Sequence, residues 1–403
     1  MDLVILAGGK GSRIKHLNKD KPKPMVKIQD KVFLELLINH YAKFNFDNIF
    51  ILAGYKGQLI KEKFDGKYQN FTKIECIIEK NPRDTGGALL VLKNKIKKDF
   101  ILINGDTYFD IKNPFKLSKN VKKTDIGCVS LIKFKNVKGI KFNNLKLDRY
   151  HNIIKVKKSS YINAGVYYFN KKIFKFINKK KISLENEILP KLIDLKKLKG
   201  EYLKDYFLDI GTPKNLKFAK KNLPKILERP AFFFDRDGVI NHDKGYTHKY
   251  KEFRFRKDVI KALKYLYGKK YYLFIVTNQG GIAKKKYTIE DFFSLHVSIK
   301  KKLAKNKIYI HDIEFCPHHP DGLVKKLSIK CKCRKPSNLM IKNINKKWFI
   351  SMKKSYFIGD KKSDESAAKK SKLKFNYVQE NLYKQVKNIV KKNQQINVFK
   401  SKN

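Results

Sequence analysis

Short runs of apolar residues recur along the chain, and each is followed by turn residues and then by an amphipathic stretch. In the first half these runs predict buried strands at residues 3–6, 49–52, 74–78 and 100–103, with a helix at residues 32–40. In the second half they predict strands at residues 231–234, 271–276, 313–315 and 355–358, and helices at 258–266, 289–304 and 364–370. This alternation favours α/β folds, each built on a mostly parallel sheet with helices on both faces.

The two series of elements indicate two domains. A chain of 403 residues is long for a single compact core. Pro224 and Pro230 lie between the two series, where a boundary is expected. We therefore expect a first domain at residues 1–223, a linker at 224–230, a second domain at 231–383 and a polar, frayed tail at 384–403.

The formal net charge is +57, which is extreme for a globular protein and raises the possibility of a nucleic-acid partner. However, the positive charge is nearly all lysine, and the lysines are spread along every segment instead of forming one patch. The hydrophobic fraction of 42% is ordinary for a folded protein. These features favour a solvated basic surface that attracts anionic small molecules, and we expect no nucleic-acid partner.

The N-terminal residues lack the basic region and the long apolar core of a signal peptide. No apolar run approaches the roughly 20 residues that are needed to cross a bilayer. The 5 cysteines do not indicate a disulfide scaffold in a chain of this size. We expect a cytoplasmic protein with no membrane partner.

An apolar run at residues 232–234 ends in two carboxylates, Asp235 and Asp237, within a turn that contains Gly238. Burying an ionised carboxylate is costly unless it is paired or bound to a metal ion. Ligands of open α/β sheets bind at the carboxyl ends of the strands. The pair is therefore expected to hold Mg²⁺ and to leave one oxygen free to attack phosphorus.

A glycine-rich turn, Leu6-Ala-Gly-Gly-Lys-Gly-Ser-Arg13, follows the first predicted strand, and Lys21-Pro-Lys-Pro-Met25 comes soon after it. Such glycines let the backbone approach a ligand and present N–H groups to phosphate oxygens. The two segments resemble those of the sugar-phosphate nucleotidyltransferases. The resemblance continues in Asp84-Thr-Gly-Gly-Ala88, Asn104-Gly-Asp-Thr107, Asn163-Ala-Gly-Val-Tyr167, Ser183-Leu-Glu-Asn-Glu-Ile-Leu-Pro190 and Asp209-Ile-Gly-Thr-Pro213.

This resemblance implies a doubly wound, Rossmann-like domain in which a sugar 1-phosphate attacks the α-phosphorus of a nucleoside triphosphate and pyrophosphate leaves. Asp106 and Asp209 would hold Mg²⁺. Arg13 would bind the leaving β- and γ-phosphates, and Lys23 would stabilise charge on the α-phosphate or the sugar phosphate. The nucleotide would lie against Leu6, Ala7, Gly8, Gly9, Gly11, Gly86 and Gly87.

One departure from the family concerns the sugar. Many relatives carry a Glu-Lys-Pro triplet ahead of the Asn-Ala-Gly strand, and its glutamate contacts sugar hydroxyls. Residues 154–159 of this chain contain no carboxylate. The sugar contact is therefore expected from Asn163 or Glu185.

The pair Asp235 and Asp237 opens a second ordered set of motifs, which continues with Thr277-Asn278, Arg334-Lys335 and Gly359-Asp-Lys-Lys-Ser-Asp364. The set resembles that of the haloacid-dehalogenase-type phosphatases and implies a second doubly wound, Rossmann-like domain. In that family the first aspartate forms an aspartyl-phosphate. Asp235 would be the nucleophile here, and Asp237 would protonate the leaving oxygen and then activate water.

The same resemblance assigns the other site residues of the second domain. Mg²⁺ would be held by Asp235, Asp360 and the backbone carbonyl of Asp237. Thr277, next to Asn278, would orient the phosphoryl oxygens, and Lys335 would neutralise them.

Three cysteines gather in one short region, in Cys316-Pro-His-His-Pro and Cys331-Lys-Cys333. Three thiolates and one imidazole make a closed tetrahedral Zn²⁺ site, which is structural and not catalytic. His318 is the preferred fourth ligand, and His319 is the alternative. The zinc would fold a loop over the phosphatase cleft and carry Arg334 to the substrate. This arrangement is similar to the histidinol-phosphatase and heptose-bisphosphate phosphatase branch.

The two resemblances fit together in one pathway. A heptose bisphosphatase releases heptose 1-phosphate, which a sugar-1-phosphate nucleotidyltransferase consumes. We therefore expect a bifunctional enzyme whose partners are heptose bisphosphate, heptose 1-phosphate and a nucleoside triphosphate, with guanine as the base by pathway analogy. The alternatives are a hexose-1-phosphate nucleotidyltransferase with a phosphatase of other specificity, and a basic nucleic-acid-binding protein with degenerate enzyme domains. The sequence leaves the oligomeric state open.

Overall fold

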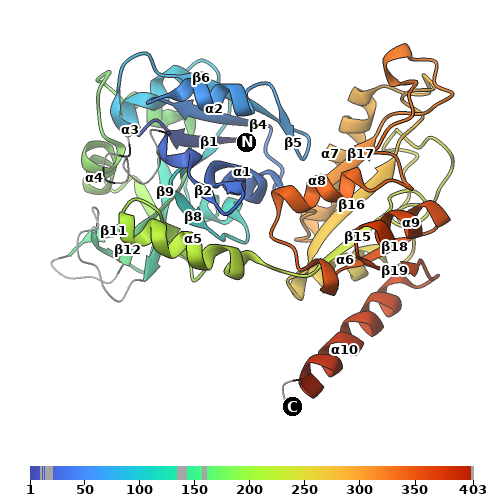
Figure 1. Cartoon of the computed structure of the whole chain (residues 1–403). Coiled ribbons are helices and arrows are strands. Elements are labelled where there is room, and N and C mark those ends of the chain that lie inside the picture. The colour runs from blue at the N-terminus through green and yellow to red at the C-terminus, as the bar shows by residue number, and fades with distance from the viewer. Residues whose placement is uncertain (10, 12, 14–20, 134–142, 157–160, 401–403) are drawn as a thin grey trace. The chain divides into compact units, whose positions relative to one another are not determined.

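The computed structural model describes residues 1–400 except 10, 12, 14–20, 134–142 and 157–160. The chain divides into two compact units, one of residues 1–40 and 46–223 and one of residues 41–45 and 224–403. Both units are α/β, as the alternating pattern predicts (Figure 1).

Parallel strands form one part of the sheet in the first unit, in the spatial order β7-β1-β4-β6. Helix α1 (Phe33–Ala42) lies between β1 and β4 in the chain, and α2 (Gly57–Phe64) lies between β4 and β6. Three of these strands, β1, β4 and β7, are apolar along most of their length because both faces of the sheet are covered, whereas β6 also carries Lys73 and Glu75. All four predicted strands of this domain are present, as β1 (Asp2–Ala7), β4 (Asn48–Ala53), β6 (Thr72–Ile78) and β7 (Phe100–Asn104).

The rest of this sheet is antiparallel or mixed, which differs from the mostly parallel sheet that the sequence predicts. β12 (Tyr161–Phe169) runs antiparallel to β7 and also pairs with β9 (Gly127–Lys133), which in turn pairs in parallel with β13 (Leu198–Tyr202). An apolar run indicates burial but not strand direction, so the pattern could not reveal this pairing. The sheet is completed by β5 (Tyr68–Gln69), β10 (Asn143–Leu147) and β11 (Ile153–Lys155).

Two short two-stranded ribbons lie outside this sheet in the first unit. β8 (Thr107–Phe109) pairs antiparallel with β14 (Phe207–Asp209), which places Thr107 opposite Asp209. β2 (Lys27–Ile28) and β3 (Lys31–Val32) form a second short ribbon. The unit also contains the short helices α3 (Asp84–Gly87) and α4 (Leu189–Asp194).

The second unit is a parallel sheet in the order β17-β16-β15-β18-β19. β15 is central, and Phe232, Phe233 and Phe234 are fully buried because layers pack on both of its faces. In chain order the strands are β15 (Ala231–Phe234), β16 (Tyr272–Asn278), β17 (Asp312–Cys316), β18 (Tyr356–Gly359) and β19 (Lys374–Tyr377). The helices are α6 (Val259–Gly268), α7 (Ile289–Lys305), α8 (Leu339–Lys347), α9 (Lys362–Lys370) and α10 (Leu382–Lys400).

Two segments expected to be irregular are helical instead. α5 (Pro213–Leu227) runs through Pro224 into the expected linker. Its apolar stripe of Leu216, Ala219, Leu223 and Leu227 is buried, which keeps the helix in place beyond the proline. The expected frayed tail forms most of α10, because Leu382, Val386 and Val390 lie on one buried face. Figure 1 shows α10 reaching beyond β18 and β19 of its own unit.

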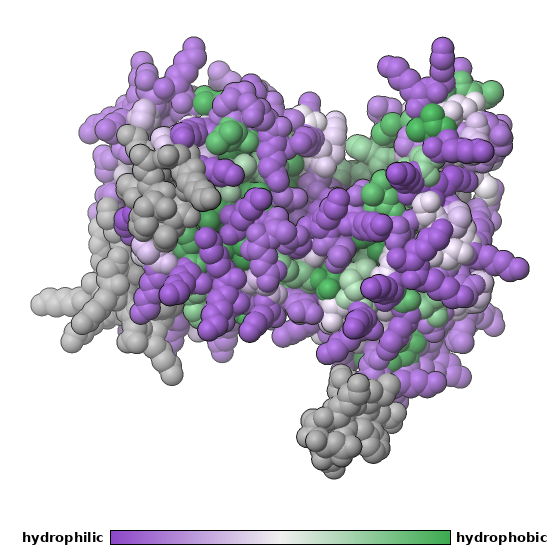
Figure 2. All heavy atoms as spheres, in the orientation of Figure 1, coloured by the Kyte–Doolittle hydropathy of each residue, from purple (hydrophilic) through white to green (hydrophobic). Residues whose placement is uncertain are grey.

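The surface agrees with the even distribution of lysine along the chain. Hydrophilic side chains cover much of the visible face of each unit, with smaller hydrophobic areas between them (Figure 2). Within the described part of the chain, no helix combines the length and the apolar character that a membrane span requires.

Candidate functional site

Carboxylates meet at the carboxyl ends of the central strands in the second unit. Asp235 directly follows β15, Asp360 directly follows β18, and Asp364 lies in the first turn of α9. Oxygens of these three side chains lie within 4.8 Å of one another. Oxygen ligands of this kind are what Mg²⁺ prefers, so the three residues could hold a divalent cation. Asp364 ends the Gly359–Asp364 motif, whose expected metal ligand was Asp360 alone.

Lys335 joins two of these carboxylates. Its Nζ lies 2.9 Å from Asp235 Oδ1 and 2.6 Å from Asp364 Oδ1, and it donates a hydrogen bond of 2.9 Å to the Val276 carbonyl oxygen. Burial raises the pKa of Asp235 to about 6, although the Lys335 ammonium opposes this shift. Lys335 thus supplies the charge that such a buried carboxylate cluster needs.

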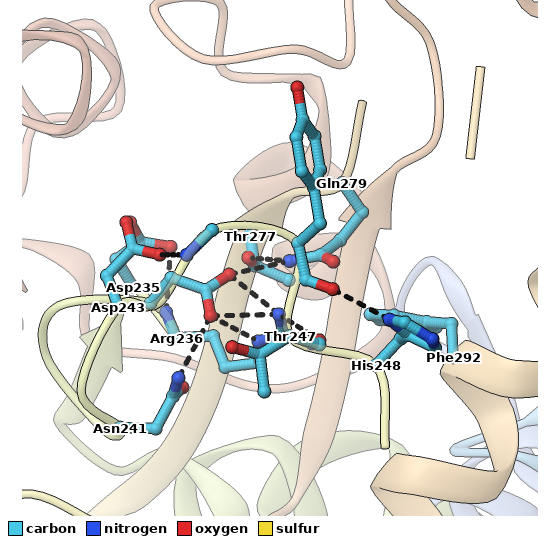
Figure 3. A network of polar contacts seen from close by, with 12 residues as sticks. Asp235, Arg236, Asn241, Asp243, Thr247, His248, Thr277, Gln279 and Phe292 are labelled. Atoms are coloured by element: carbon cyan, nitrogen blue, oxygen red, sulfur yellow. Dashed lines mark hydrogen bonds and ion pairs between the residues drawn. The ribbon is translucent and has the colours of Figure 1, made fainter. Parts of the chain in front are cut away.

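The Asp237 carboxylate lies in a separate set of contacts. Arg236 donates from Nε to Oδ1 at 3.1 Å and from Nη2 to both oxygens at 2.8 and 2.7 Å. Asn241 Nδ2 and Gln279 Nε2 each donate at 3.0 Å. Figure 3 shows Arg236, Asn241 and Gln279 in one network of polar contacts. Burial alone would raise the pKa of Asp237, but the Arg236 guanidinium and these donors hold it below its ordinary value.

The turn after Asp237 brings its backbone close to the candidate cation site. Gly238 adopts φ +83°, a conformation that favours glycine. A Cβ at this position would collide with the Asp360 carboxylate. The backbone of the turn therefore passes directly beside Asp360, as expected if the Asp237 carbonyl contributes to the cation site.

Thr277 and Asn278 end β16, and their side chains have different partners. Thr277 Oγ1 accepts a hydrogen bond of 2.8 Å from Gln279 Nε2 and lines the cavity beside Asp235. The Asn278 side chain accepts from the Lys335 backbone N–H at 2.9 Å and donates to its carbonyl at 3.1 Å. Asn278, expected among the catalytic residues, thus holds the segment that carries Lys335.

A cavity of about 550 Å³ opens over Asp235, and its lining includes several cationic side chains. His319 and Arg334 both lie close to Gly280. A Cβ placed at Gly280 would be 3.0 Å from His319 Cδ2 and 3.1 Å from Arg334 Nη1, so the two side chains are neighbours. Burial and the charges of Arg334 and Lys284 lower the pKa of His319, so Lys284 belongs to the same group. The cavity therefore combines an anionic end at Asp235 with a cationic group of Arg334 and Lys284 beside the His319 imidazole.

The expected zinc residues come together beside this cavity. Cys316 Sγ lies 3.5 Å from Cys331 Sγ and 3.1 Å from Cys333 Sγ, and His318 Nδ1 lies 3.2 Å from Cys333 Sγ. Four donors around a Zn²⁺ with Zn–S bonds of about 2.3 Å would be about 3.8 Å apart, so the set needs only slight expansion. The donors fit a tetrahedral metal site. His319 is not in this group and lies at the cavity wall.

The first unit gathers its expected charged residues around β8 and β14. Lys23 is buried and forms an ion pair with Asp106. Thr107 Oγ1 lies 3.3 Å from Asp106 Oδ1 and 3.5 Å from Asp209 Oδ2. Burial and the Asp106 carboxylate raise the pKa of Asp209, whereas Lys23 and Arg13 lower it. The four expected residues Arg13, Lys23, Asp106 and Asp209 thus share one electrostatic site.

The glycines expected at the nucleotide divide into two groups. Gly8 and Gly9 follow β1, after Leu6 and Ala7. Gly11 adopts φ +60°, and a Cβ there would be 2.9 Å from Lys23 Cβ. By contrast, the N–H groups of Gly86 and Gly87 both donate to the Ile182 carbonyl at 3.0 Å. These two N–H groups are thereby occupied within the fold, and the glycines allow close packing of α3.

The residues expected at the sugar already have partners inside the unit. Asn163 donates to Tyr167 Oη at 2.7 Å and accepts from the Gly165 N–H at 2.9 Å. Glu185 accepts from Thr85 Oγ1 at 2.5 Å. Residues 157–159 of the segment without a carboxylate lie outside the described residues.

Comparison with known proteins identifies the families. Residues 3–226, more than half of the chain, match the model described as Nucleotidyl transferase, and residues 230–388 match Polynucleotide kinase 3 phosphatase. The chain belongs to the nucleotidyl transferase family. Its second half is similar to D-glycero-beta-D-manno-heptose-1,7-bisphosphate 7-phosphatase of Yersinia pestis, at 43% identity over 139 residues, 34% of this chain and 74% of that protein. That coverage places the chain in the heptose-bisphosphate phosphatase family as well.

The first half of this nucleotidyl transferase is similar to D-glycero-alpha-D-manno-heptose 1-phosphate guanylyltransferase of Campylobacter jejuni. The two are 35% identical over 223 residues, 53% of this chain and 96% of that protein. The crystal structure of HddC from Yersinia pseudotuberculosis is 31% identical with a TM-score of 0.46, over 55% of this chain and 99% of that chain. The chain is therefore an enzyme with a nucleotidyltransferase domain and a phosphatase domain, and both expected family memberships are confirmed.

Proposed function

We propose that the phosphatase unit removes the 7-phosphate of D-glycero-D-manno-heptose 1,7-bisphosphate and that the transferase unit joins GMP from GTP to the resulting heptose 1-phosphate. The names of the two relatives support this pair of reactions. Because the transferase relative is named for the α anomer, the α-configured bisphosphate is the substrate that would connect the two steps.

The cavity over Asp235 is the observation that carries the phosphatase part. A bisphosphate needs two anion-binding positions, and the cavity offers Lys335 at one and the cationic group of Lys284 and Arg334 at the other. Arginine and lysine are the usual partners of phosphate oxygens. The phosphate that leaves would lie at Asp235, and the phosphate that stays would lie at the cationic group.

The phosphatase residues divide the reaction into two steps. An oxygen of Asp235 attacks phosphorus, the bond to the sugar oxygen breaks, and Asp237 gives that oxygen a proton. Water then attacks the aspartyl-phosphate, its proton passes to Asp237, and Asp235 is released. The donors around Asp237 favour the carboxylate form that the second step needs, so substrate binding must bring the proton for the first step.

The metals that the two families imply fit the residues present. In the phosphatase unit, Asp235, Asp360 and Asp364 would hold Mg²⁺, which supplies charge neutralisation at the phosphoryl oxygens. Cys316, His318, Cys331 and Cys333 would hold Zn²⁺ and fix the segment that carries Arg334, whose Nη1 donates to the His318 carbonyl at 3.3 Å. Both reactions would take place in the cytoplasm, where thiols stay reduced.

In the transferase unit the protein would act by positioning and by charge. Asp106 and Asp209 would hold Mg²⁺ at the α-phosphate, and the Arg13 guanidinium would bind the pyrophosphate that leaves. Lys23, which is ion-paired with Asp106, would neutralise charge as the sugar phosphate oxygen attacks.

The deciding experiment offers the enzyme heptose 1,7-bisphosphate with Mg²⁺ and each nucleoside triphosphate in turn. We expect free phosphate, pyrophosphate and GDP-heptose with GTP, and more of each from the α than from the β anomer. Hexose bisphosphates serve as the comparison substrates. Faster phosphate release from a hexose bisphosphate, or failure to form any nucleotide-heptose, would refute the proposal.

A further inference from the structure

Gln279 connects two of the proposed phosphatase residues through one amide group. Its Nε2 donates to Asp237 Oδ2 at 3.0 Å and to Thr277 Oγ1 at 2.8 Å. An amide nitrogen carries two hydrogens, so these contacts use both of them. Gln279 is almost fully buried. It therefore sets hydrogen-bond partners both for the residue proposed to transfer protons and for the residue proposed to orient the phosphoryl oxygens.

The backbone of Gln279 is fixed, but its contacts do not decide which way the amide faces. The backbone N–H donates to the Cys316 carbonyl at 2.7 Å, and the backbone carbonyl accepts from the Ile282 N–H at 3.2 Å. The amide lies at the end of a flexible side chain, and its oxygen and nitrogen have nearly the same shape. A partner that distinguishes the oxygen from the nitrogen is needed to hold it in one orientation.

Tyr287, shortly before α7, is such a partner. Its hydroxyl donates to Gln279 Oε1. Its ring stacks on the His248 imidazole, with centroids 5.1 Å apart and an angle of 5° between the planes. A Cβ at Gly281 would collide with the tyrosine ring, so the glycine lets the ring come this close. Burial raises the pKa of Tyr287, and the hydroxyl therefore keeps its proton and stays a donor.

The reverse orientation of the amide is disfavoured at both ends. It would place Oε1 beside the Asp237 carboxylate, so that an acceptor faced an anion. It would also turn the amide oxygen away from the Tyr287 hydroxyl. In the observed orientation Thr277 Oγ1 accepts from Gln279, and a hydroxyl that accepts can still donate its own hydrogen. Since Thr277 lines the cavity, that hydrogen can be directed at a phosphoryl oxygen.

We propose that Tyr287 is a positioning residue of the phosphatase reaction, which fixes the Gln279 amide so that one hydrogen faces Asp237 and the other faces Thr277. The tyrosine acts through the amide and not on the reacting atoms. The inference rests on the roles proposed for Asp237 and Thr277 in phosphate release. It does not depend on which sugar is the substrate.

Tyr287→Phe removes the hydroxyl but keeps the ring beside His248. We expect kcat for phosphate release to fall about 10-fold, the effect of one lost hydrogen bond. KM should stay within about twofold, because the hydroxyl holds an amide that acts on the reaction and does not bind the substrate. Steady-state assays of free phosphate give both constants.

Tyr356→Phe is the matched control. Tyr356 is buried to a similar extent, and its hydroxyl also donates to an amide oxygen, Asn393 Oδ1, at 2.6 Å. It begins β18, whereas Asp360 follows the other end of that strand. Urea unfolding checks that both variants are folded, and kcat should fall for Tyr287→Phe alone.

Gln279→Met tests whether the tyrosine acts through the amide, because methionine keeps the length of the side chain but has no amide. This variant should lower kcat by more than Tyr287→Phe does. In the Gln279→Met background, adding Tyr287→Phe should change kcat by less than about twofold, since the two residues form one unit.

Three results would overturn the inference: an unchanged kcat in Tyr287→Phe, the same loss from Tyr287→Phe in the Gln279→Met background, or an equal loss in Tyr356→Phe. Absence of phosphate release from heptose 1,7-bisphosphate by the unaltered enzyme would instead refute the proposed substrate. The same comparison of variants is then made with an aryl phosphate, so the two failures are distinguishable.

Discussion

The guanidinium of Arg236 holds both carboxylate oxygens of Asp237, with Nη2 at 2.8 and 2.7 Å. Arg236 is almost fully buried, and its Nη2 also donates to the Thr247 carbonyl at 3.0 Å. The arginine therefore orients the group that is proposed to exchange protons with the leaving sugar and with water.

Replacing Arg236 by lysine keeps the charge but removes the two-point contact with Asp237. We expect phosphate release to fall by about 10- to 100-fold, as for loss of a hydrogen bond between charged groups. Nucleotide transfer should be unchanged. Arg254→Lys, which alters an exposed arginine of the same unit, is the control. Wild-type phosphate release by the folded Arg236→Lys variant would contradict the positioning role.

Asp235→Asn and Asp106→Asn should separate the two activities. The first removes the proposed nucleophile, so phosphate release should become undetectable while supplied heptose 1-phosphate is still converted to nucleotide-heptose. The second removes a proposed Mg²⁺ ligand and should do the reverse. Assays of free phosphate and of pyrophosphate on each variant check this. Loss of both activities in either variant would argue against independent sites.

Lys284→Met tests the proposed position for the retained phosphate. The side chain belongs to the cationic group on the cavity wall, so KM for heptose 1,7-bisphosphate should rise about 10-fold or more. Hydrolysis of a simple aryl phosphate, which has no second phosphate, should keep its KM. Lys286→Met removes an exposed charge two residues away and serves as the control. Equal effects on both substrates would refute a phosphate-specific role.

Cys333→Ser should release the metal from the cluster of Cys316, His318, Cys331 and Cys333. Elemental analysis is expected to find about one equivalent of zinc in the wild type and little in the variant. Phosphate release should fall sharply because the segment that carries Arg334 and Lys335 loses its support. Cys128→Ala, at a buried cysteine of the other unit, should retain the zinc. Full zinc content in Cys333→Ser would disprove the ligand set.

His296 predicts a pH dependence of stability. Burial lowers its pKa to about 3 in the folded protein, from an ordinary value near 6.5. The unfolded chain therefore binds one more proton than the folded chain between these values, and the free energy of unfolding should decrease as pH falls through this range. His296→Gln should reduce that slope by about 1.4 kcal/mol per pH unit. Urea unfolding of both proteins from pH 7 to pH 4 measures the difference, and parallel curves would contradict it.

The strand-end motifs could be predicted from sequence because each one interrupts an apolar run. Asp235 and Asp360 directly follow buried strands, Thr277 lies at the end of one, and adjacent parallel strands bring the three together. Asp364 ends the Gly359–Asp364 motif, but it reaches the cluster from helix α9, so the motif does not reveal which side chains it contacts. Gly86 and Gly87 have a local pattern that predicts contact with the nucleotide. Their backbone N–H groups instead donate to the carbonyl of Ile182, a residue distant in sequence, and the pattern does not reveal this contact.

The division of one chain into a transferase unit and a phosphatase unit also bears on how a cell would control the two proposed steps. Both active centres are made by the same round of translation, so they are always present in equal numbers. Changes in gene expression cannot alter the ratio of the two steps. Accumulation of the sugar 1-phosphate would therefore depend on the turnover rates of the two centres and on the supply of nucleotide and metal ions. Those are the quantities through which the balance of the two steps could be adjusted.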